Sequence, residues 1–211
     1  MQLISLPVSP FAARVRIAIY AKGLAVAIEP PPAGWPNSPQ FRDISPTGRV
    51  PALILDDGTA LWESAVILET LEELFPEATP LLGSDVLARA QARLLMAHAD
   101  HYLMPPMIAL AAGPDEQETR RLMGRLDEAL TILDDLVDGG PYAVGEALSL
   151  GDCALAPVLF AARVTGQRLG FDLLTSTPNV ARYAATIADD EHVARVLAEM
   201  EDGLSRLVRT G

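Results

Sequence analysis

The sequence predicts an α/β domain followed by an all-helical domain. In the first 76 residues, short apolar runs that suit buried strands alternate with helical patterns. From Asp85 onward, apolar residues recur only at helical spacing. A stretch rich in turn-forming residues, 77–84, separates the two patterns and predicts a linker. We therefore expect one domain at residues 1–76 and a second at residues 85–211.

The start of the chain predicts a β-α-β unit. Gln2–Leu6 is a short apolar run that suits a buried strand. Ser9 is a favourable N-cap and Pro10 a favourable first helical residue, because the missing N–H of proline needs no partner there. Gly23 suits the C-terminal stop of this helix, and Ala25–Glu29 suits a second strand. A helical crossover between two strands implies that they pair in parallel.

The rest of the α/β domain is organised around the stretch from Arg49 to Ser64. A short helix at Phe41–Ile44 precedes it. Two strands, Ala52–Leu55 and Ala60–Trp62, flank Asp57-Gly58, for which we expect a two-residue turn of the primed type, since glycine accepts a positive φ. A helix then follows, with Ser64 expected as its N-cap.

The second domain is predicted from helical periodicity alone. A long helix carries Leu87, Leu94, His98 and Tyr102 on one side and is interrupted near Pro105-Pro106. The segment 150–164 is apolar on nearly every face and predicts a buried central helix. Ser149-Leu150-Gly151-Asp152 predicts a capping box at its start, with a structural role for Asp152. Further helical patterns cover residues 122–133, 181–187 and 193–207.

Composition excludes several classes of protein. The formal net charge is −12, and no basic stripe is present to neutralise phosphates, so we expect neither nucleic-acid nor membrane binding. No run of 18 apolar residues predicts a membrane span. Cys153 is the only cysteine, which rules out an intramolecular disulfide, a C-x-x-C pair and a thiolate zinc cluster. We found no targeting signal and expect a cytoplasmic protein.

A paired charge site is predicted where the hairpin meets the helix. The N–H groups of a helix N-terminus favour an anion, and Glu63 beside them favours a cation. Such a pair suits the α-carboxylate and α-ammonium of an amino acid. The alternative is a hairpin and a capped helix that bind nothing.

These residues resemble the glutathione-binding core of the cytosolic glutathione transferases. Val50-Pro51-Ala52-Leu53 followed by Glu63-Ser64 and an amphipathic helix carries the resemblance. It implies a thioredoxin-like first domain, a cis Val50-Pro51 bond, pairing of Val50 with the cysteinyl part of glutathione, and a γ-glutamyl site at Glu63-Ser64. Family members often place a basic residue in the loop after the second strand; Arg49 is the candidate substitute here.

Ser9 is the candidate catalytic residue. Placed before Pro10-Phe11, it resembles the serine of zeta- and tau-like transferases, which implies a hydroxyl that donates to the glutathione sulfur and favours its thiolate. The alternative is a simple N-cap. The zeta-class pattern Ser-Ser-Cys is absent, which argues against maleylacetoacetate isomerisation. The cysteine-type reactions of related classes are disfavoured because Cys153 lies in the other domain.

Other side chains are candidates for a substrate pocket or a metal. Phe11, His98, Tyr102 and Met104 are the pocket candidates that the resemblance suggests, with ordinary core or surface positions as the alternative. His98 and His101 share a helix face, but no carboxylate completes a metal set, so we expect no metal.

The resemblance implies a cytoplasmic homodimer that conjugates glutathione, its co-substrate, with a small apolar electrophile in detoxification. Two alternatives stay open. One is a binding or regulatory protein that keeps the fold without catalysis, as stringent-starvation-type proteins do. The other is a glutathione-dependent isomerase.

Overall fold

The computed structural model describes residues 1–210, which divide into two compact units. Met1–Leu81 and the chain from His192 onward form the first unit, and Leu82–Glu191 form the second. The predicted succession of an α/β region and a helical region is confirmed. The last helix groups with the sheet, and the boundaries at residues 76 and 85 remain a prediction.

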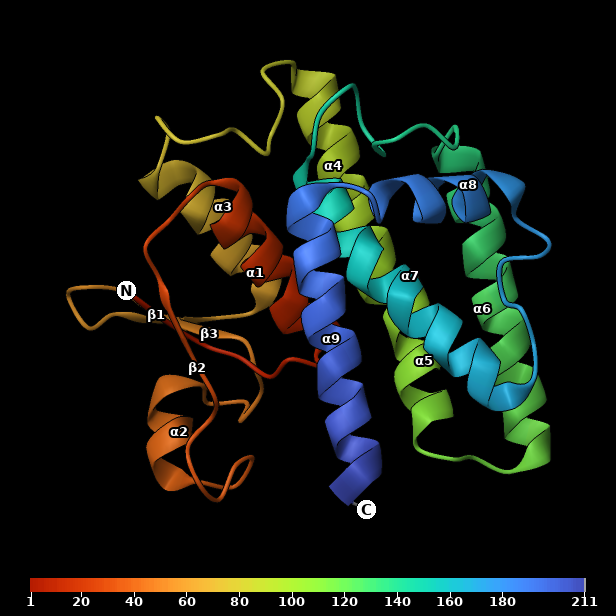
Figure 1. Cartoon of the computed structure of the whole chain (residues 1–211), viewed down its shortest axis with the longest axis horizontal. Helices are drawn as coiled ribbons and strands as arrows, with labels where there is room; N and C mark the ends of the chain where they lie inside the picture. The colour runs from red at the N-terminus through yellow and green to blue at the C-terminus, as the bar shows by residue number, and fades with distance from the viewer. Residues whose placement is uncertain (211) are drawn as a thin grey trace. The chain divides into compact units, whose positions relative to one another are not determined.

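A four-stranded mixed sheet forms the centre of the first unit (Figure 1). The strand order is β2-β1-β3-β4. The predicted parallel pairing of β1 with β2 is confirmed, and β3 pairs antiparallel with both β1 and β4. Leu3 lies between Ile28 and Leu53 in the register, which places two fully buried leucines side by side. The strands are β1 (Gln2–Ile4), β2 (Ala27–Glu29), β3 (Ala52–Ile54) and β4 (Ala60–Trp62).

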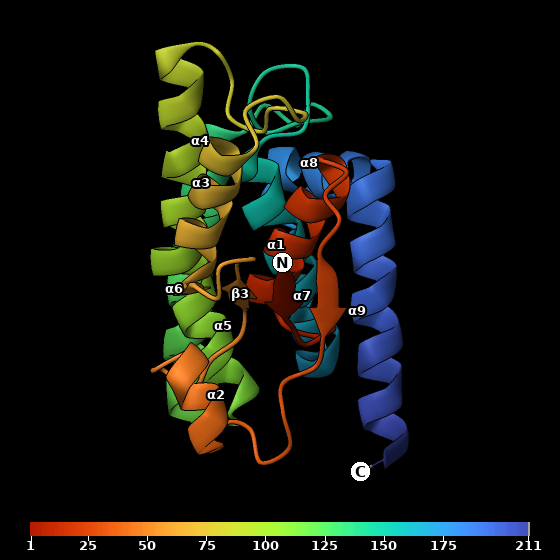
Figure 2. The ribbon, with the colours of Figure 1, turned by 90° about the vertical axis from the view of Figure 1, so that its left-hand side faces the viewer.

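Three helices lie within the same stretch of chain: α1 (Pro10–Ala21), α2 (Pro39–Ile44) and α3 (Ser64–Leu74). α1 and α3 pack against each other, as Figures 1 and 2 both show. The predicted start and stop of α1 are confirmed, because the Ser9 side chain accepts from Ala12 and Gly23 has φ +64°. Phe41 of α2 packs on Ile4 and Ala52 of the sheet.

The turn between β3 and β4 differs from the prediction of a two-residue primed turn. The N–H of Leu55 donates to the Thr59 carbonyl at 2.8 Å, so residues 56–58 form the loop. Gly58 has φ +86°, whereas Asp57 keeps a negative φ. The reason lies in the Asp57 carboxylate, which accepts from the Thr59 N–H at 2.8 Å and stabilises a local turn of its own. Asp57 then needs no positive φ.

The long helix α9 (Glu191–Thr210) packs on α1 in the first unit (Figures 1 and 2). Glu199 of α9 accepts hydrogen bonds from Arg16 and Tyr20 of α1. Val193, Val196 and Met200, which belong to the helical pattern predicted over residues 193–207, are buried, whereas Leu207 of the same pattern is exposed. The C-terminal helix is therefore held to the helix that Ser9 caps.

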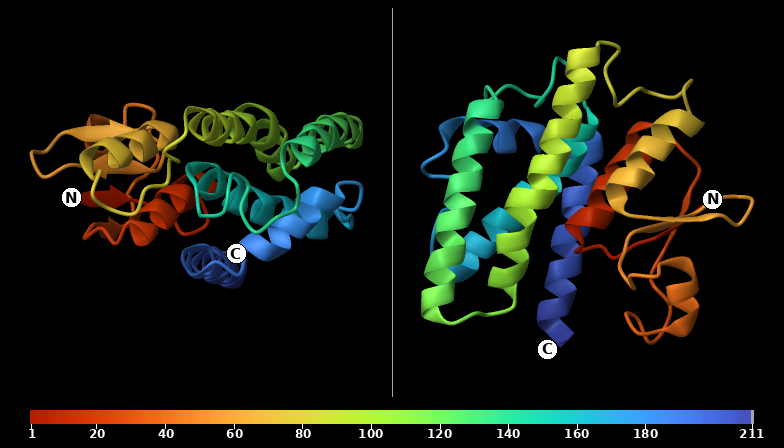
Figure 3. Two further views of the ribbon diagram at one scale, coloured as in Figure 1. Left: turned by 90° about the horizontal axis from the view of Figure 1, so that it is seen from above. Right: turned by 180° about the vertical axis from the view of Figure 1, so that it is seen from behind.

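The second unit is entirely helical within the residues described (Figure 3). The predicted interruption of the long helix is a π-helical segment, η1 (Ala99–Leu103), which one residue, Met104, separates from Pro105-Pro106. Both prolines then fall in the first turn of α5, where a missing N–H needs no partner. The elements are α4 (Val86–His98), η1 (Ala99–Leu103), α5 (Met104–Ala111), α6 (Glu116–Leu136), α7 (Leu150–Leu169) and α8 (Pro178–Ile187).

The predicted buried helix and its capping box are both confirmed in α7. The Ser149 side chain accepts from the Asp152 N–H, and Asp152 accepts from the Ser149 N–H at 2.8 Å. Asp152 also accepts from the Tyr183 hydroxyl at 2.8 Å and from the Ala143 N–H at 2.7 Å. Burial raises the pKa of Asp152, although these hydrogen bonds oppose the shift. Asp152 thus ties three parts of the helical unit together.

No helix within residues 1–210 combines the length and the apolar character needed to cross a bilayer.

Candidate functional site

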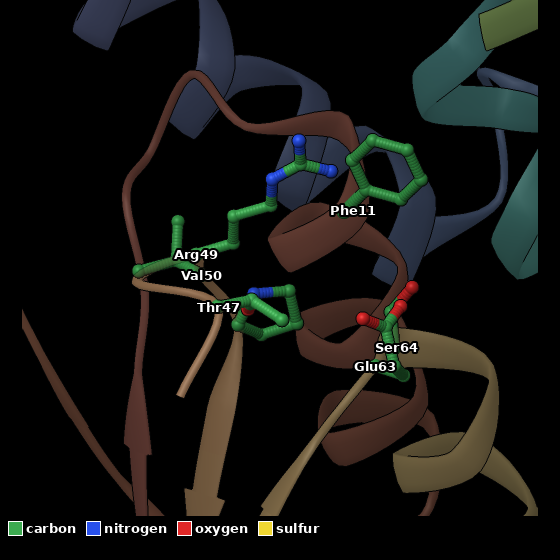
Figure 4. Close-up of a pocket in the computed structure, with 7 residues that line it drawn as sticks. Phe11, Thr47, Arg49, Val50, Glu63 and Ser64 are labelled. Atoms are coloured by element: carbon green, nitrogen blue, oxygen red, sulfur yellow. The ribbon is translucent and has the colours of Figure 1, made fainter. Parts of the chain in front are cut away.

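A pocket in the first unit brings the predicted glutathione-binding residues together. It lies where the loop before β3 faces the start of α3 (Figure 4). Five of its lining residues are those that the sequence singled out for binding, and a sixth, Phe11, was a pocket candidate. The lining residues are Phe11, Thr47, Arg49, Val50, Pro51, Glu63 and Ser64.

The start of α3 differs from the prediction that Ser64 is its N-cap. Glu63 occupies the N-cap position, since its carbonyl accepts from the Ile67 N–H at 3.0 Å, and Ser64 is the first helical residue. No side chain caps this helix. The N–H groups of its first turn therefore have no side-chain acceptor, and helix N–H groups in this state favour an anion.

Glu63 has a strained backbone, with φ +69° and ψ 111°. Within residues 1–210 it is the sole non-glycine residue with a positive φ. Such a conformation costs about 1–3 kcal/mol and is concentrated at functional sites. Figure 4 shows the side-chain oxygens of Glu63 and Ser64 close together at the start of α3. The carboxylate of Glu63 is exposed, whereas Ser64 is only 5% exposed.

The opposite wall of the pocket is the loop before β3, whose backbone is fixed by a hydrogen bond from a buried serine. Val50-Pro51 is a cis peptide bond, as the family resemblance implied. The buried Ser45 hydroxyl donates to the Arg49 carbonyl at 2.9 Å and lies 3.2 Å from the Thr47 hydroxyl. Thr47 was not predicted as a lining residue, because nothing in a lone threonine before Gly48 marks a pocket.

The pocket presents opposite charges on its two sides. Arg49 extends from the loop and Glu63 stands at the helix, and both side chains are exposed. Together with the N–H groups of α3, the site offers two places for an anion and one for a cation. That pattern matches a zwitterionic molecule with a second carboxylate.

Ser9 is the N-cap of α1, where its Oγ accepts from the Ala12 N–H at 3.3 Å. A hydroxyl that accepts one hydrogen bond retains its own hydrogen as a donor. Ser9 is not among the residues that line the pocket, although Phe11, two residues later, is. Ser9 therefore stands at the N-terminus of α1 with a hydroxyl hydrogen that can be donated.

The remaining candidates lie in the helical unit and are not among the lining residues of this pocket. His98 is buried, with Nε2 2.9 Å from the Ala129 carbonyl. That contact makes Nε2 a hydrogen-bond donor, which removes it as a metal ligand, and burial lowers the pKa of His98. The His98 ring stacks on the Tyr102 ring, with the two ring centres 5.3 Å apart. Tyr102 is exposed, and Met104 is buried. Among the described residues, no group of three potential ligands gathers to hold a metal.

Two family models match the chain. The model for the N-terminal domain of glutathione S-transferase matches residues 3–79, and the model for the C-terminal domain matches residues 116–186.

Individual relatives agree with these models. A maleylacetoacetate isomerase from Pseudomonas aeruginosa is 33% identical over 182 residues, which cover 81% of this chain and 83% of the relative. A stringent starvation protein A homolog from Coxiella burnetii is 34% identical and covers 76% of this chain and 75% of its own.

Solved structures agree over nearly the whole chain. A tau class glutathione S-transferase from mango has a TM-score of 0.85 at 25% identity and covers 100% of this chain and 98% of its own. The rice protein GST1 (OsGSTU1), solved in complex with glutathione, has a TM-score of 0.82 at 25% identity. The match covers 99% of this chain and 97% of the rice chain. The thioredoxin-like domain that the resemblance predicted, followed by a helical domain, is thereby confirmed, and the chain belongs to the glutathione transferase family.

Proposed function

We propose that the chain is a transferase that binds glutathione in the pocket at the start of α3 and uses Ser9 to activate its thiol. The observation that carries this proposal is the uncapped N-terminus of α3, with Glu63 and Ser64 facing the loop of Arg49 and Val50. The rice relative solved with glutathione supports the choice of co-substrate.

Each end of glutathione has a matching group in the pocket. The α-carboxylate of the γ-glutamyl end binds the first-turn N–H groups of α3 and the Ser64 hydroxyl, because both donate to an anion. The α-ammonium pairs with Glu63. The backbone of Val50 pairs with the cysteinyl part, and Arg49 meets the glycyl carboxylate. The tripeptide thus lies between α3 and the loop before β3.

The thiol is activated at the N-terminus of α1. The positive end of the α1 dipole and a hydrogen bond from the Ser9 hydroxyl both stabilise a thiolate more than a thiol. The thiol proton leaves to solvent. A sulfur lone pair then forms a carbon–sulfur bond with the electrophile, which accepts the electrons or expels a leaving group. Ser9 itself forms no covalent bond.

Two other functions have an observation in their favour. The Pseudomonas relative is a maleylacetoacetate isomerase, which favours glutathione-dependent isomerisation, but Ser9-Pro10-Phe11 replaces the zeta-class pattern. The Coxiella relative is a stringent starvation protein A homolog, which favours a binding role without catalysis. Assays of conjugation and of isomerisation distinguish these alternatives, because a binding protein catalyses neither reaction and an isomerase catalyses only the second.

Calorimetry with glutathione, followed by a panel of small electrophiles, tests the proposal. Ser64→Ala removes one hydrogen bond to a charged group, which contributes about 1.5–3 kcal/mol, so the Kd for glutathione should rise more than about tenfold. Ser64 caps no helix, so urea melts should change little. Thr70→Ala, on the same helix and outside the pocket, is the matched control.

Unchanged glutathione affinity in Ser64→Ala would show that the α3 terminus does not bind the co-substrate. Tight glutathione binding with no electrophile consumed would favour the binding role. Isomerisation of maleylacetoacetate without net conjugation would favour the isomerase.

A further inference from the structure

A buried arginine connects the loop before Ser9 to the C-terminal helix. Arg16 is 3% exposed. Its Nη2 donates to the Pro7 carbonyl at 2.7 Å, and its Nη1 donates to Glu199 Oε2 at 2.8 Å. Pro7 precedes Ser9 by two residues, so one guanidinium joins the Ser9 loop to α9.

Glu199 is held from several directions at once. Its Oε1 accepts from the Tyr20 hydroxyl at 2.9 Å and lies 3.6 Å from the Arg195 Nε. The Arg195 guanidinium also lies 3.6 Å above the centre of the Tyr20 ring, a cation–π arrangement. A carboxylate fixed by three partners in this way has little freedom, so the Arg16 side chain that it anchors is fixed too.

Gly203 brings α9 directly against the same loop. A Cβ placed on Gly203 would lie 2.9 Å from Pro7 Cβ and 2.9 Å from Val8 Cγ1, closer than real carbon atoms approach. Glycine at this position therefore permits the contact between helix and loop. Glu199 and Gly203 lie one helical turn apart, on the side of α9 that faces the loop.

We propose that α9 positions Ser9: Glu199 acts through Arg16, and Gly203 through direct contact, to fix the Pro7–Ser9 loop. This inference rests on the proposed function, because it assigns Ser9 a reacting partner. Glu199, Arg16 and Gly203 are positioning residues, since they act through Ser9. Displacement of a reacting group by about 1 Å is enough to lower a rate about a hundredfold, so the position of this loop controls how strongly Ser9 stabilises a thiolate.

The other end of α1 supplies a control. Lys22 donates to Glu72 at 2.8 Å and to the Thr79 carbonyl at 3.0 Å, and the Lys22 side chain is buried. Glu72→Gln and Glu199→Gln therefore make the same change to a carboxylate that pairs with a buried cation of α1. The difference is that Arg16, the partner of Glu199, also donates to the Pro7 carbonyl in the loop before Ser9, whereas Lys22, the partner of Glu72, donates to the Thr79 carbonyl.

The test is the thiolate absorbance of bound glutathione against pH, in the full-length protein at saturating glutathione. Ser9→Ala should lower the acidity of the bound thiol about tenfold, and Glu199→Gln should lower it severalfold. Glu199→Gln should have no further effect when Ser9 is already alanine, because the effect passes through Ser9. Glu72→Gln should lower stability in urea and leave the titration unchanged.

Gly203→Ala keeps every charge and gives a second route to the same result. Alanine favours a helix over glycine, so this variant should stay folded while its side chain displaces the loop, and the titration should shift towards that of Ser9→Ala. Gly124→Ala on α6, where a Cβ meets no atom within 4 Å, is the matched control and should leave the titration unchanged. Arg16→Lys keeps the charge but has one nitrogen for two acceptors, and it should shift the titration as well.

The outcomes separate the two proposals. If the pKa of the bound thiol shifts in Ser9→Ala but not in Glu199→Gln or Gly203→Ala, the positioning role is overturned and the proposed function stands. An equal effect of Glu199→Gln with and without the Ser9 hydroxyl shows that Glu199 acts by another route, which also overturns it. No shift in Ser9→Ala, or no glutathione bound, removes the proposed function, and the positioning role falls with it.

Discussion

Replacing Glu63 with glycine should make the protein more stable and weaken its binding of glutathione. Glu63 has φ +69°, where a residue with a Cβ pays about 1–3 kcal/mol and glycine pays nothing. The greater entropy of glycine in the unfolded chain offsets about 0.5–1 kcal/mol of that gain. The free energy of unfolding of Glu63→Gly should therefore exceed that of Glu63→Ala by about 1 kcal/mol, since alanine keeps the strain.

The effect on binding follows from the exposure of the carboxylate. An exposed ion pair contributes about 1 kcal/mol at most, so loss of the Glu63 carboxylate should raise the Kd for glutathione roughly fivefold. Both variants should show the same loss. Urea melts measure the stability difference and calorimetry measures the Kd.

Two results would refute this reasoning. Equal stability of Glu63→Gly and Glu63→Ala would mean that the backbone at residue 63 stores no strain. Unchanged glutathione affinity in both variants would mean that the carboxylate does not face the ligand, and the pocket would lose its cation site.

Three further predictions concern the remaining parts of the chain. Asp152→Asn should lower the free energy of unfolding by about 3 kcal/mol in urea melts, because an amide NH₂ then faces buried donors; unchanged stability would contradict the role of the capping box. Burial raises the pKa of Asp152, so the folded state holds the proton more tightly than the unfolded state. The free energy of unfolding of wild type should therefore exceed that of Asp152→Asn by less as pH rises above about 4. A difference that grew over this range would mean that folding lowers the pKa of Asp152. Light scattering should give twice the 22.5 kDa chain mass, since Trp62, Val66 and Leu94 leave apolar surface exposed for a second copy; the monomer mass at micromolar concentration would contradict it.

Much of the fold was predictable because its signals are local. Ser9 before Pro10, Gly23 after the helix, and Ser149 three residues before Asp152 each specify a helix end through hydrogen bonds within a few residues. The parallel pairing of β1 with β2 and the β3–β4 hairpin followed from the apolar runs and from the length of the connection between them, whereas the antiparallel pairing of β1 with β3 was not predicted. These features need no knowledge of the rest of the chain.

The missed features depend on distant packing or on competition between neighbours. Glu63 takes a positive φ at the junction of β4 and α3, a conformation that the sequence preference of a glutamate does not predict. Asp57-Gly58 was expected to form a two-residue primed turn, but the hydrogen bond from the Thr59 N–H to the Asp57 carboxylate stabilises a different turn. Thr47 enters the pocket through the course of a loop, and Glu199 meets Arg16 across 183 residues of sequence. No local pattern reports such contacts.

The most direct test of the central claim is the thiol titration of bound glutathione in wild type and in Ser9→Ala. If the Ser9 hydroxyl and the α1 terminus stabilise the thiolate, the pKa of the bound thiol in wild type should fall well below the ordinary thiol value of about 8.5. Ser9→Ala should raise it by about one unit, equivalent to about 1.4 kcal/mol, while most of the glutathione affinity remains. Identical titrations in the two proteins would remove Ser9 from the mechanism and contradict the account.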